Sequence, residues 1–159
     1  FGSCFINGET GWIAGDYGTI IHTSNGGETW EQQESGTTAL LMDITFLTSL
    51  KGWAVGENGT ILSTSDGGRT WYTQESNITY LLNGVSCIDQ LNCWAVGYGT
   101  ILGTGDGGSN WNVLQGDRKM WLYEIDTREP GKIFTAGDFG EILASNDRGR
   151  TWVTRIPRE

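Results

Sequence analysis

Short runs of alternating hydrophobic and polar positions, separated by glycine-rich turns, make up most of the chain. Residues 41–46 alternate between apolar and polar side chains, as a half-buried β-strand does. Three further runs rich in strand-forming residues follow at 52–55, 60–64 and 70–74. The short segments between them contain glycine with asparagine or aspartate, which favours tight turns. The pattern predicts four antiparallel strands, and helical periodicity is absent from the whole sequence.

This four-stranded pattern occurs four times along the 159 residues. The copies end at tryptophans that are 41, 40 and 41 residues apart, namely Trp30, Trp71, Trp111 and Trp152. A fixed period of this length is typical of proteins built from stacked or ring-arranged repeats. A unit of about 40 residues is too small to have a core of its own, so neighbouring units must bury their apolar faces against each other.

Four strands per repeat predict an all-β fold in which each repeat is one blade of a β-propeller. We assign residues 1–159 to a single repeat domain, with blades at approximately 1–34, 42–75, 83–115 and 123–155. The chain is then a compact ring of four blades, a piece of a larger propeller, or half of an eight-bladed dimer. An array that does not close exposes two apolar blade faces, which favours self-association, so we expect a closed ring or an oligomer.

Each repeat has the same turn just before its closing tryptophan. In the second repeat the turn reads TSDGGRTW over residues 64–71, and its acidic or amide residue recurs as Asn25, Asp66, Asp106 and Asp147. Such a side chain accepts hydrogen bonds from backbone N–H groups, and glycine adopts the positive φ that the turn needs. Calcium binding is the alternative, but calcium takes six to eight oxygen ligands and each turn offers no more than one carboxylate. We therefore assign these residues and the four tryptophans a structural role.

The turn resembles the Asp-box, or bacterial neuraminidase repeat, with the pattern S/T-x-D-x-G-x-T-W. The longer segment GWAVGENGTILSTSDGGRTW, at residues 52–71, is similar to the propeller family that includes photosystem II stability and assembly factors. The resemblance covers all four repeats and implies a β-propeller, usually with more blades than the four found here. It favours a non-enzymatic scaffold for protein binding or assembly.

Two of the three cysteines, Cys87 and Cys93, flank a turn-like stretch between two predicted strands. A hairpin there would bring them within bridging range, and the alternative is a pair of free cysteines in the core. A disulfide would imply an oxidising compartment. A pair at these positions also resembles secreted bacterial members of the family. We therefore predict an extracytoplasmic location, which is secreted, periplasmic or similar to the thylakoid lumen.

The charge of the chain bears on its partners. The net charge is −9, with 10 basic and 19 acidic residues, which argues against a nucleic-acid binder. No apolar run is long enough to span a membrane. Residues 118–159 nevertheless contain 8 of the 10 basic residues. One interpretation is chance variation on a soluble surface, and the other is that the last repeat faces an acidic neighbour.

An enzyme is the less favoured interpretation. Sialidases also carry Asp-boxes, and that resemblance implies arginines on the inner strands. No arginine lies in the first strand of repeats one to three. In repeat four, Arg128 is predicted to lie just past the first strand. A glycosidase would need two carboxylates, and Asp43 and Glu124 occupy the same position in repeats two and four. A single histidine and no CxxC pair argue against zinc, and no phosphate-binding motif is present. We predict no catalytic residue, no metal and no cofactor.

Candidate binding residues lie in the turns and linkers where the repeats differ. The turn between the second and third strands should emerge on the same face as the linker between blades. Aromatic rings among acids and amides there can stack on or hydrogen-bond a peptide or a sugar. These residues are Asp16, Tyr17, Glu57, Asn58, Tyr80, Tyr98, Arg118, Trp121, Asp138 and Phe139. The predicted partner is a protein, and the alternative is a glycan bound by a carbohydrate-binding module or by a fragment of a sialidase-like or xyloglucanase-like propeller. The other interpretation is that these are ordinary turn residues and that Tyr80 and Trp121 pack in the core.

Overall fold

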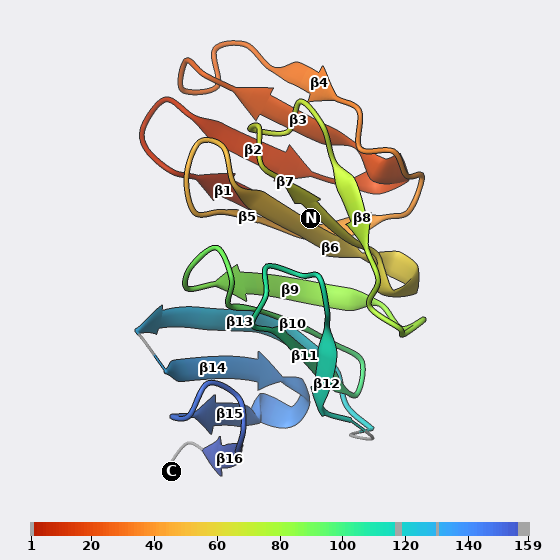
Figure 1. Cartoon of the computed structure of the whole chain (residues 1–159), viewed down its shortest axis with the longest axis vertical. Coiled ribbons are helices and arrows are strands. Elements are labelled where there is room, and N and C mark those ends of the chain that lie inside the picture. The colour runs from red at the N-terminus through yellow and green to blue at the C-terminus, as the bar shows by residue number, and fades with distance from the viewer. Residues whose placement is uncertain (1, 117–118, 130, 156–159) are drawn as a thin grey trace.

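The computed structural model describes residues 2–116, 119–129 and 131–155, and within them the chain forms four antiparallel sheets of four strands each (Figure 1). Blade 1 contains β1 (Ser3–Phe5), β2 (Gly11–Ala14), β3 (Ile20–Thr23) and β4 (Glu31–Gln33). Blade 2 contains β5 (Leu41–Phe46), β6 (Gly52–Gly56), β7 (Ile61–Thr64) and β8 (Tyr72–Gln74). Blade 3 contains β9 (Leu82–Cys87), β10 (Cys93–Gly97), β11 (Thr100–Thr104) and β12 (Asn112–Gln115). Blade 4 contains β13 (Leu122–Glu129), β14 (Lys132–Gly137), β15 (Ile142–Ser145) and β16 (Val153–Arg155).

The strand order in every sheet follows the chain, so the predicted all-β architecture of four-stranded blades is confirmed. Some predicted strand ends were wrong. The fourth strand of blade 2 begins at Tyr72 rather than at residue 70, because the backbone N–H of Thr70 donates to Asp66 and keeps Thr70 in the turn. Strand β13 continues to Glu129, so Arg128 lies in this strand and not just past it.

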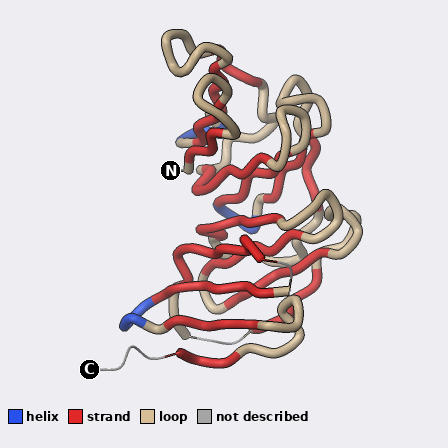
Figure 2. The backbone as a smooth tube through the Cα atoms, turned by 90° about the vertical axis from the view of Figure 1, so that its left-hand side faces the viewer, coloured by secondary structure: helices blue, strands red, loops and turns tan. Residues whose placement is uncertain are grey.

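The four blades stack in an open arc (Figures 1 and 2). The first strands β1, β5, β9 and β13 lie beside one another in that order. Phe5 in blade 1 and Phe134 in blade 4 lie on the two end faces and are each about half exposed. The compact ring of four blades, one of the predicted alternatives, is therefore not formed, because the blades turn too little to bring blade 4 back to blade 1.

Each hydrophobic core lies between two neighbouring blades. Between blades 1 and 2, Trp12 stacks on Phe46 with 3.6 Å between ring centroids, and Trp71 meets Phe46 edge-on at 5.8 Å. The second core joins Trp53 in blade 2 to blade 3, and the third joins blade 3 to blade 4. The expectation that single repeats cannot bury a core alone agrees with this arrangement.

Side chains on the first strands connect the blades at the inner edge of the arc. The carboxylate of Asp43 accepts a hydrogen bond from the backbone N–H of Val85 in the next blade at 2.9 Å. The Asn83 amide donates to the carbonyl of Leu122 at 2.8 Å, and the Ser86 and Thr127 hydroxyls are 2.7 Å apart. These contacts set the spacing between neighbouring blades where they lie closest together.

The turn before each closing tryptophan has one repeated hydrogen-bond pattern. In blade 2 the Thr64 hydroxyl donates to Asp66 at 2.8 Å and accepts from the N–H of Gly68 at 2.9 Å, while Asp66 accepts from the N–H of Thr70. The same bonds form around Asn25, Asp106 and Asp147. Hydrogen bonds from Asn110 and Thr104 lower the pKa of Asp106 to about 2, and those from Thr151 and Ser145 lower the pKa of Asp147 to about 2.

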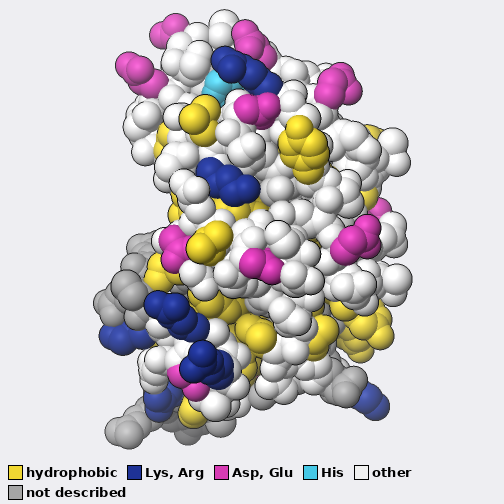
Figure 3. All heavy atoms as spheres, in the orientation of Figure 1, with side chains coloured by type: hydrophobic (Ala, Val, Ile, Leu, Met, Phe, Trp, Pro, Cys, Tyr) yellow, Lys and Arg dark blue, Asp and Glu magenta, His cyan; other side chains and the backbone are white. Residues whose placement is uncertain are grey.

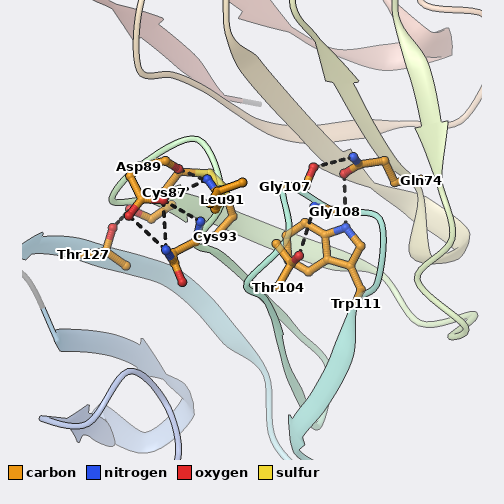
Figure 4. The surroundings of a disulfide bond; sticks show 12 residues. Gln74, Cys87, Asp89, Leu91, Cys93, Thr104, Gly107, Gly108, Trp111 and Thr127 are labelled. Carbon is orange, nitrogen blue, oxygen red and sulfur yellow. Dashed lines mark hydrogen bonds between the residues drawn. A yellow bond between two sulfur atoms is a disulfide. The ribbon is translucent and has the colours of Figure 1, made fainter.

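The closing tryptophans also fasten one blade to the next. The Gln74 amide of blade 2 donates to the carbonyl of Gly107 at 2.9 Å and accepts from the Trp111 indole at 3.1 Å (Figure 4). Gln33 makes the same two bonds from blade 1 to Gly67 and Trp71. Trp30 and Trp152 are partly buried in the end blades.

A disulfide joins Cys87 at the end of β9 to Cys93 at the start of β10, which are directly paired across the hairpin (Figure 4). Asp89 accepts the backbone N–H groups of Leu91 and Asn92 at 2.8 Å and so holds the loop between the cysteines. Cys4 carries a free thiol that accepts the N–H of Phe46 at 3.3 Å.

Replacing both Cys87 and Cys93 by serine is expected to lower the free energy of unfolding by about 2 kcal/mol, because a short disulfide loop restricts the unfolded chain by roughly this amount. Urea denaturation of the wild type and the double variant measures the difference. Adding a reductant should destabilise only the wild type. A wild type unaffected by reductant would show that the bond is not formed.

Candidate functional site

Three aromatic side chains from different segments meet at one end of blades 3 and 4. Tyr98 lies in the turn between β10 and β11, 6.1 Å from the ring of Tyr80 and 4.9 Å from the ring of Trp121, measured between centroids. Tyr80 and Trp121 belong to the linkers before β9 and β13. Tyr80 is exposed, and Tyr98 and Trp121 retain accessible surface. We call these three residues the aromatic strip.

The turn that carries Tyr98 differs from the other three turns at this end. Blades 1, 2 and 4 have one-turn 3₁₀ segments here, η1 (Asp16–Gly18), η2 (Glu57–Gly59) and η3 (Asp138–Gly140). Blade 3 has one residue fewer, so Tyr98 forms an isolated antiparallel bridge with Trp121 instead. The missing residue explains why Trp71 and Trp111 are 40 residues apart, whereas the other closing tryptophans are 41 apart. This shorter spacing was the sequence signal for the contact between Tyr98 and Trp121.

Asp138 fixes one end of the aromatic strip. One carboxylate oxygen accepts the backbone N–H of Trp121 at 2.8 Å, and the other accepts the hydroxyl of Tyr123 at 2.6 Å. The bonds from Trp121 and then Tyr123 lower the pKa of Asp138, and the bond to Asp138 raises the pKa of the Tyr123 hydroxyl. Sequence reasoning missed Tyr123, because it lies at the start of a strand rather than in a turn or linker.

Two further aromatic residues project from the 3₁₀ segments without joining a core. Tyr17 is 86% exposed and Phe139 is fully exposed, and their φ angles are 54° and 58°. A bulky residue other than glycine is uncommon at such φ values. Neither ring adds to the packing of a core.

The remaining predicted site residues are not brought to the aromatic strip. Asp16, Glu57 and Asn58 are exposed in the turns of blades 1 and 2. Arg118 lies outside the described residues. Tyr17 instead borders a groove of about 500 Å³ whose other walls are Gly18 and residues 32–38, at the start of the first linker.

The two carboxylates considered for catalysis lie in a groove of about 320 Å³ between the first strands. Asp43 accepts backbone N–H groups of Ile44 and Val85. Burial raises the pKa of Asp43 to about 6, the two N–H donors oppose this rise, and the charge of Glu124 adds to it. Both oxygens of Asp43 already bind backbone, which fits a connection between blades 2 and 3 better than a catalytic acid.

In the described residues, no group of three or more histidine, cysteine or acidic side chains is arranged to hold a metal ion. The described part of the chain also contains no helix with the length and hydrophobicity that a membrane crossing requires.

Fold and turns together define a BNR-type β-propeller array of four blades. A family model for the photosynthesis system II assembly factor YCF48 matches residues 29–156, so the chain belongs to this family. The resemblance inferred from the repeats is thereby confirmed. A search of curated protein sequences found no match.

Several solved structures share the fold. A structure described as YCF48 bound to D1 peptide is 18% identical, with a TM-score of 0.63 over 98% of this chain and 82% of that one. YCF48 from Cyanidioschyzon merolae is 20% identical, with a TM-score of 0.76 over the whole of this chain and 56% of that one. The GH74 xyloglucanase from Xanthomonas campestris is 12% identical, with a TM-score of 0.75 over 99% of this chain and 30% of that one. The chain thus spans about half of one YCF48 structure and under a third of the xyloglucanase.

Proposed function

We propose that this chain is a non-enzymatic scaffold that binds an extended protein segment through the aromatic strip of Tyr80, Tyr98 and Trp121. The four blades act as one domain, and the turns and linkers at one end of blades 3 and 4 form the contact surface. The single observation that carries this proposal is the cluster of three accessible aromatic rings, in which the backbone of Trp121 is held by Asp138.

Several features support a protein partner. The chain belongs to an assembly-factor family, and one structure of similar fold was solved with a D1 peptide. Tyrosine and tryptophan are frequent in the most energetically important contacts of protein interfaces, because a rigid ring buries much surface at little entropic cost. Asp138 and the Tyr123 hydroxyl, which hydrogen-bond each other beside the strip, supply polar groups at its edge.

We further propose an extracytoplasmic location. The Cys87–Cys93 disulfide supports it, since structural disulfides persist in oxidising compartments. Alkylation of free thiols in the protein isolated from its native cells, followed by mass spectrometry, would show whether Cys87 and Cys93 are bonded there.

The binding proposal predicts that Tyr98→Ala weakens peptide binding at least tenfold, which is about 1.4 kcal/mol, because Tyr98 contacts both other rings of the strip. An array of overlapping peptides from the D1 protein finds the binding segment, and fluorescence anisotropy with that peptide measures the dissociation constants. Tyr72→Ala is the matched control, because Tyr72 is an exposed tyrosine of β8 outside the strip. No bound peptide, or equal affinities of the two variants, would contradict the proposal.

A glycan is the second candidate ligand. Accessible aromatic rings beside an acid also suit a sugar. GH74 enzymes are among the proteins of similar structure, and at 12% identity they show only the fold. A glycan array separates the candidates. Strong binding of an oligosaccharide that is lost in Tyr98→Ala, without binding of any peptide, would favour the glycan.

A further inference from the structure

The loop between the first two strands of a blade contains the same side-chain contact in blades 1, 2 and 3. One polar side chain accepts the backbone N–H groups two and three residues further along the chain. This acceptor is Asn7 in blade 1, Thr48 in blade 2 and Asp89 in blade 3. All three residues are exposed, including those of blades 2 and 3, which have a neighbouring blade on both sides. The exposure of this loop therefore comes from its place within a blade and does not depend on what precedes blade 1.

Among these three loops, only that of blade 1 combines the contact with an asparagine–glycine step. The residues that follow the acceptor are Gly8, Ser49 and Gln90. A backbone nitrogen attacks a preceding asparagine side chain most readily when it belongs to glycine, which has no Cβ to hinder the approach. Gly8 is exposed, and within the described residues its N–H has no hydrogen-bond acceptor. Its nitrogen is therefore available for reaction with the side chain of Asn7.

The sequence contains three other asparagine–glycine steps, and the fold restrains each of them. The N–H groups of Gly26 and Gly59 each donate to a backbone carbonyl at 2.8 Å. Asn83 lies in strand β9, and its side-chain amide donates to a backbone carbonyl at 2.8 Å. A nitrogen or an amide that is already bonded must break that contact before it reacts, which adds to the barrier. The fold thus distinguishes Asn7 from the other three asparagines.

We propose that Asn7 is a site of spontaneous covalent modification, at which the side-chain amide is converted to a carboxylate through a cyclic imide. The geometry of the loop supports this reaction. Because Oδ1 of Asn7 reaches the N–H groups of Glu9 and Thr10, the side chain folds over the intervening peptide bond, which contains the Gly8 nitrogen. The modification is independent of the proposed peptide binding, since none of these residues belongs to the aromatic strip.

The same two contacts stabilise the charge that develops during the reaction. When the Gly8 nitrogen attacks Cγ of Asn7, negative charge collects on Oδ1. This oxygen already accepts the N–H of Glu9 at 2.8 Å and the N–H of Thr10 at 2.7 Å. Donors that are in place before the charge develops lower the barrier, as they do in the oxyanion holes of hydrolytic enzymes. The loop of blade 1 therefore favours attack on its own asparagine.

The reaction needs only water and hydroxide from the solvent. The Gly8 nitrogen loses its proton to hydroxide and forms a bond to Cγ of Asn7. The bond between Cγ and Nδ2 then breaks, and Nδ2 takes a proton from water and leaves as ammonia. Water next adds to one of the two carbonyls of the cyclic imide and opens it. The product is aspartate, or isoaspartate when the main chain continues through the former side-chain carbonyl.

The two products differ in how well they fit the fold. Aspartate is compatible with this loop, because Asp89 makes the same contacts at 2.8 Å in blade 3. Isoaspartate adds a carbon to the main chain and displaces Glu9, whose carbonyl accepts the N–H of Gly26 in the turn before Trp30. Isoaspartate should therefore loosen the contact between this loop and that turn, whereas aspartate should preserve it.

The new charge falls on an acidic part of the molecule. Residues 1–34 contain five acidic residues and no lysine or arginine. In Figure 3, acidic side chains are spread over the upper part of the molecule, where blades 1 and 2 lie. Either product adds one negative charge to the net charge of −9, and blade 1 has no lysine or arginine to neutralise it. Anion-exchange chromatography should therefore separate the modified chain from the unmodified one.

Incubation of the folded 159-residue chain at mildly alkaline pH tests the proposal. Digestion at acidic pH and mass spectrometry measure the conversion of Asn7 and Asn58 over time. Asn7 should react roughly tenfold faster, which corresponds to about 1.4 kcal/mol of activation free energy. In urea, where the contacts of the fold are lost, the two rates should become similar. An amide that persists at Asn7, a rate no higher than that of Asn58, or a ratio of rates that urea leaves unchanged would overturn the proposal.

Two variants test the chemistry of the loop. Gly8→Ala should slow the reaction by about tenfold, because the added methyl group hinders the attacking nitrogen. A Cβ at this position meets no atom within 4 Å, so the variant should fold normally. The double substitution Thr48→Asn and Ser49→Gly transfers the step to the same loop of blade 2, where the new asparagine should react at a rate similar to that of Asn7. Melting temperatures confirm that both variants are folded, and an unchanged rate in the first or an unreactive loop in the second would contradict the proposed chemistry.

Discussion

Replacing Trp12 by alanine is expected to lower the free energy of unfolding by roughly 3–5 kcal/mol, the usual cost of removing a large buried aromatic side chain. Trp12 is completely buried, stacks on Phe46 and donates its indole N–H to the carbonyl of Gly67 at 3.3 Å. Its removal leaves a cavity between blades 1 and 2, while the carbonyl of Gly67 keeps the hydrogen bond from Gln33. Because small domains are stable by only about 5–15 kcal/mol, this loss is a large share of the total stability.

Trp12→Phe is the matched control for this experiment. A phenylalanine ring keeps the stacking on Phe46 but cannot donate to Gly67, so the expected loss is about 1–2 kcal/mol. Urea denaturation followed by circular dichroism measures all three proteins. If alanine costs no more than phenylalanine, blade 1 does not depend on packing against blade 2.

The second large effect is a loss of stability between pH 4 and pH 6 that is due to Asp43. Burial raises the pKa of Asp43 from 3.8 to about 6 in the folded protein. The folded state therefore holds this proton more tightly than the unfolded chain does, so the contribution of Asp43 to stability is fully present below pH 4 and is lost as the pH rises through 6. A shift of about two units corresponds to about 3 kcal/mol.

Asp43→Asn should remove this pH dependence, because the amide does not ionise and its oxygen still accepts one of the two backbone N–H groups. The difference in unfolding free energy between the wild type and this variant, measured from pH 4 to pH 7, isolates Asp43 from other titrating groups. Glu124→Gln is the control, since the charge of Glu124 makes only a smaller contribution to the pKa of Asp43. Parallel curves for the wild type and Asp43→Asn would refute the assignment.

The sequence predicted the blades well because their signals are local and repeated four times. The alternating strands, the glycine turns and the closing tryptophans each depend on residues within one repeat. The first strand of blade 4 was predicted to end before Arg128, but it continues to Glu129. Its end depends on pairing with β14 rather than on the composition of the segment.

Contacts between blades were less predictable. The cluster of Tyr98 with Tyr80 and Trp121 depends on the shortened turn of blade 3 and on the position of two linkers. The raised pKa of Asp43 depends on its depth between two first strands. Neither can be read from a single repeat, because both arise only when neighbouring blades are placed side by side.

The sharing of every core between two adjacent blades has a consequence for how such a gene can change. A duplicated or deleted repeat brings both halves of an interface with it, so a change of one whole repeat leaves the remaining contacts intact. A deletion of half a repeat instead leaves one aromatic surface without its partner. The chain can therefore lengthen or shorten during evolution in steps of about 40 residues, the length of one repeat.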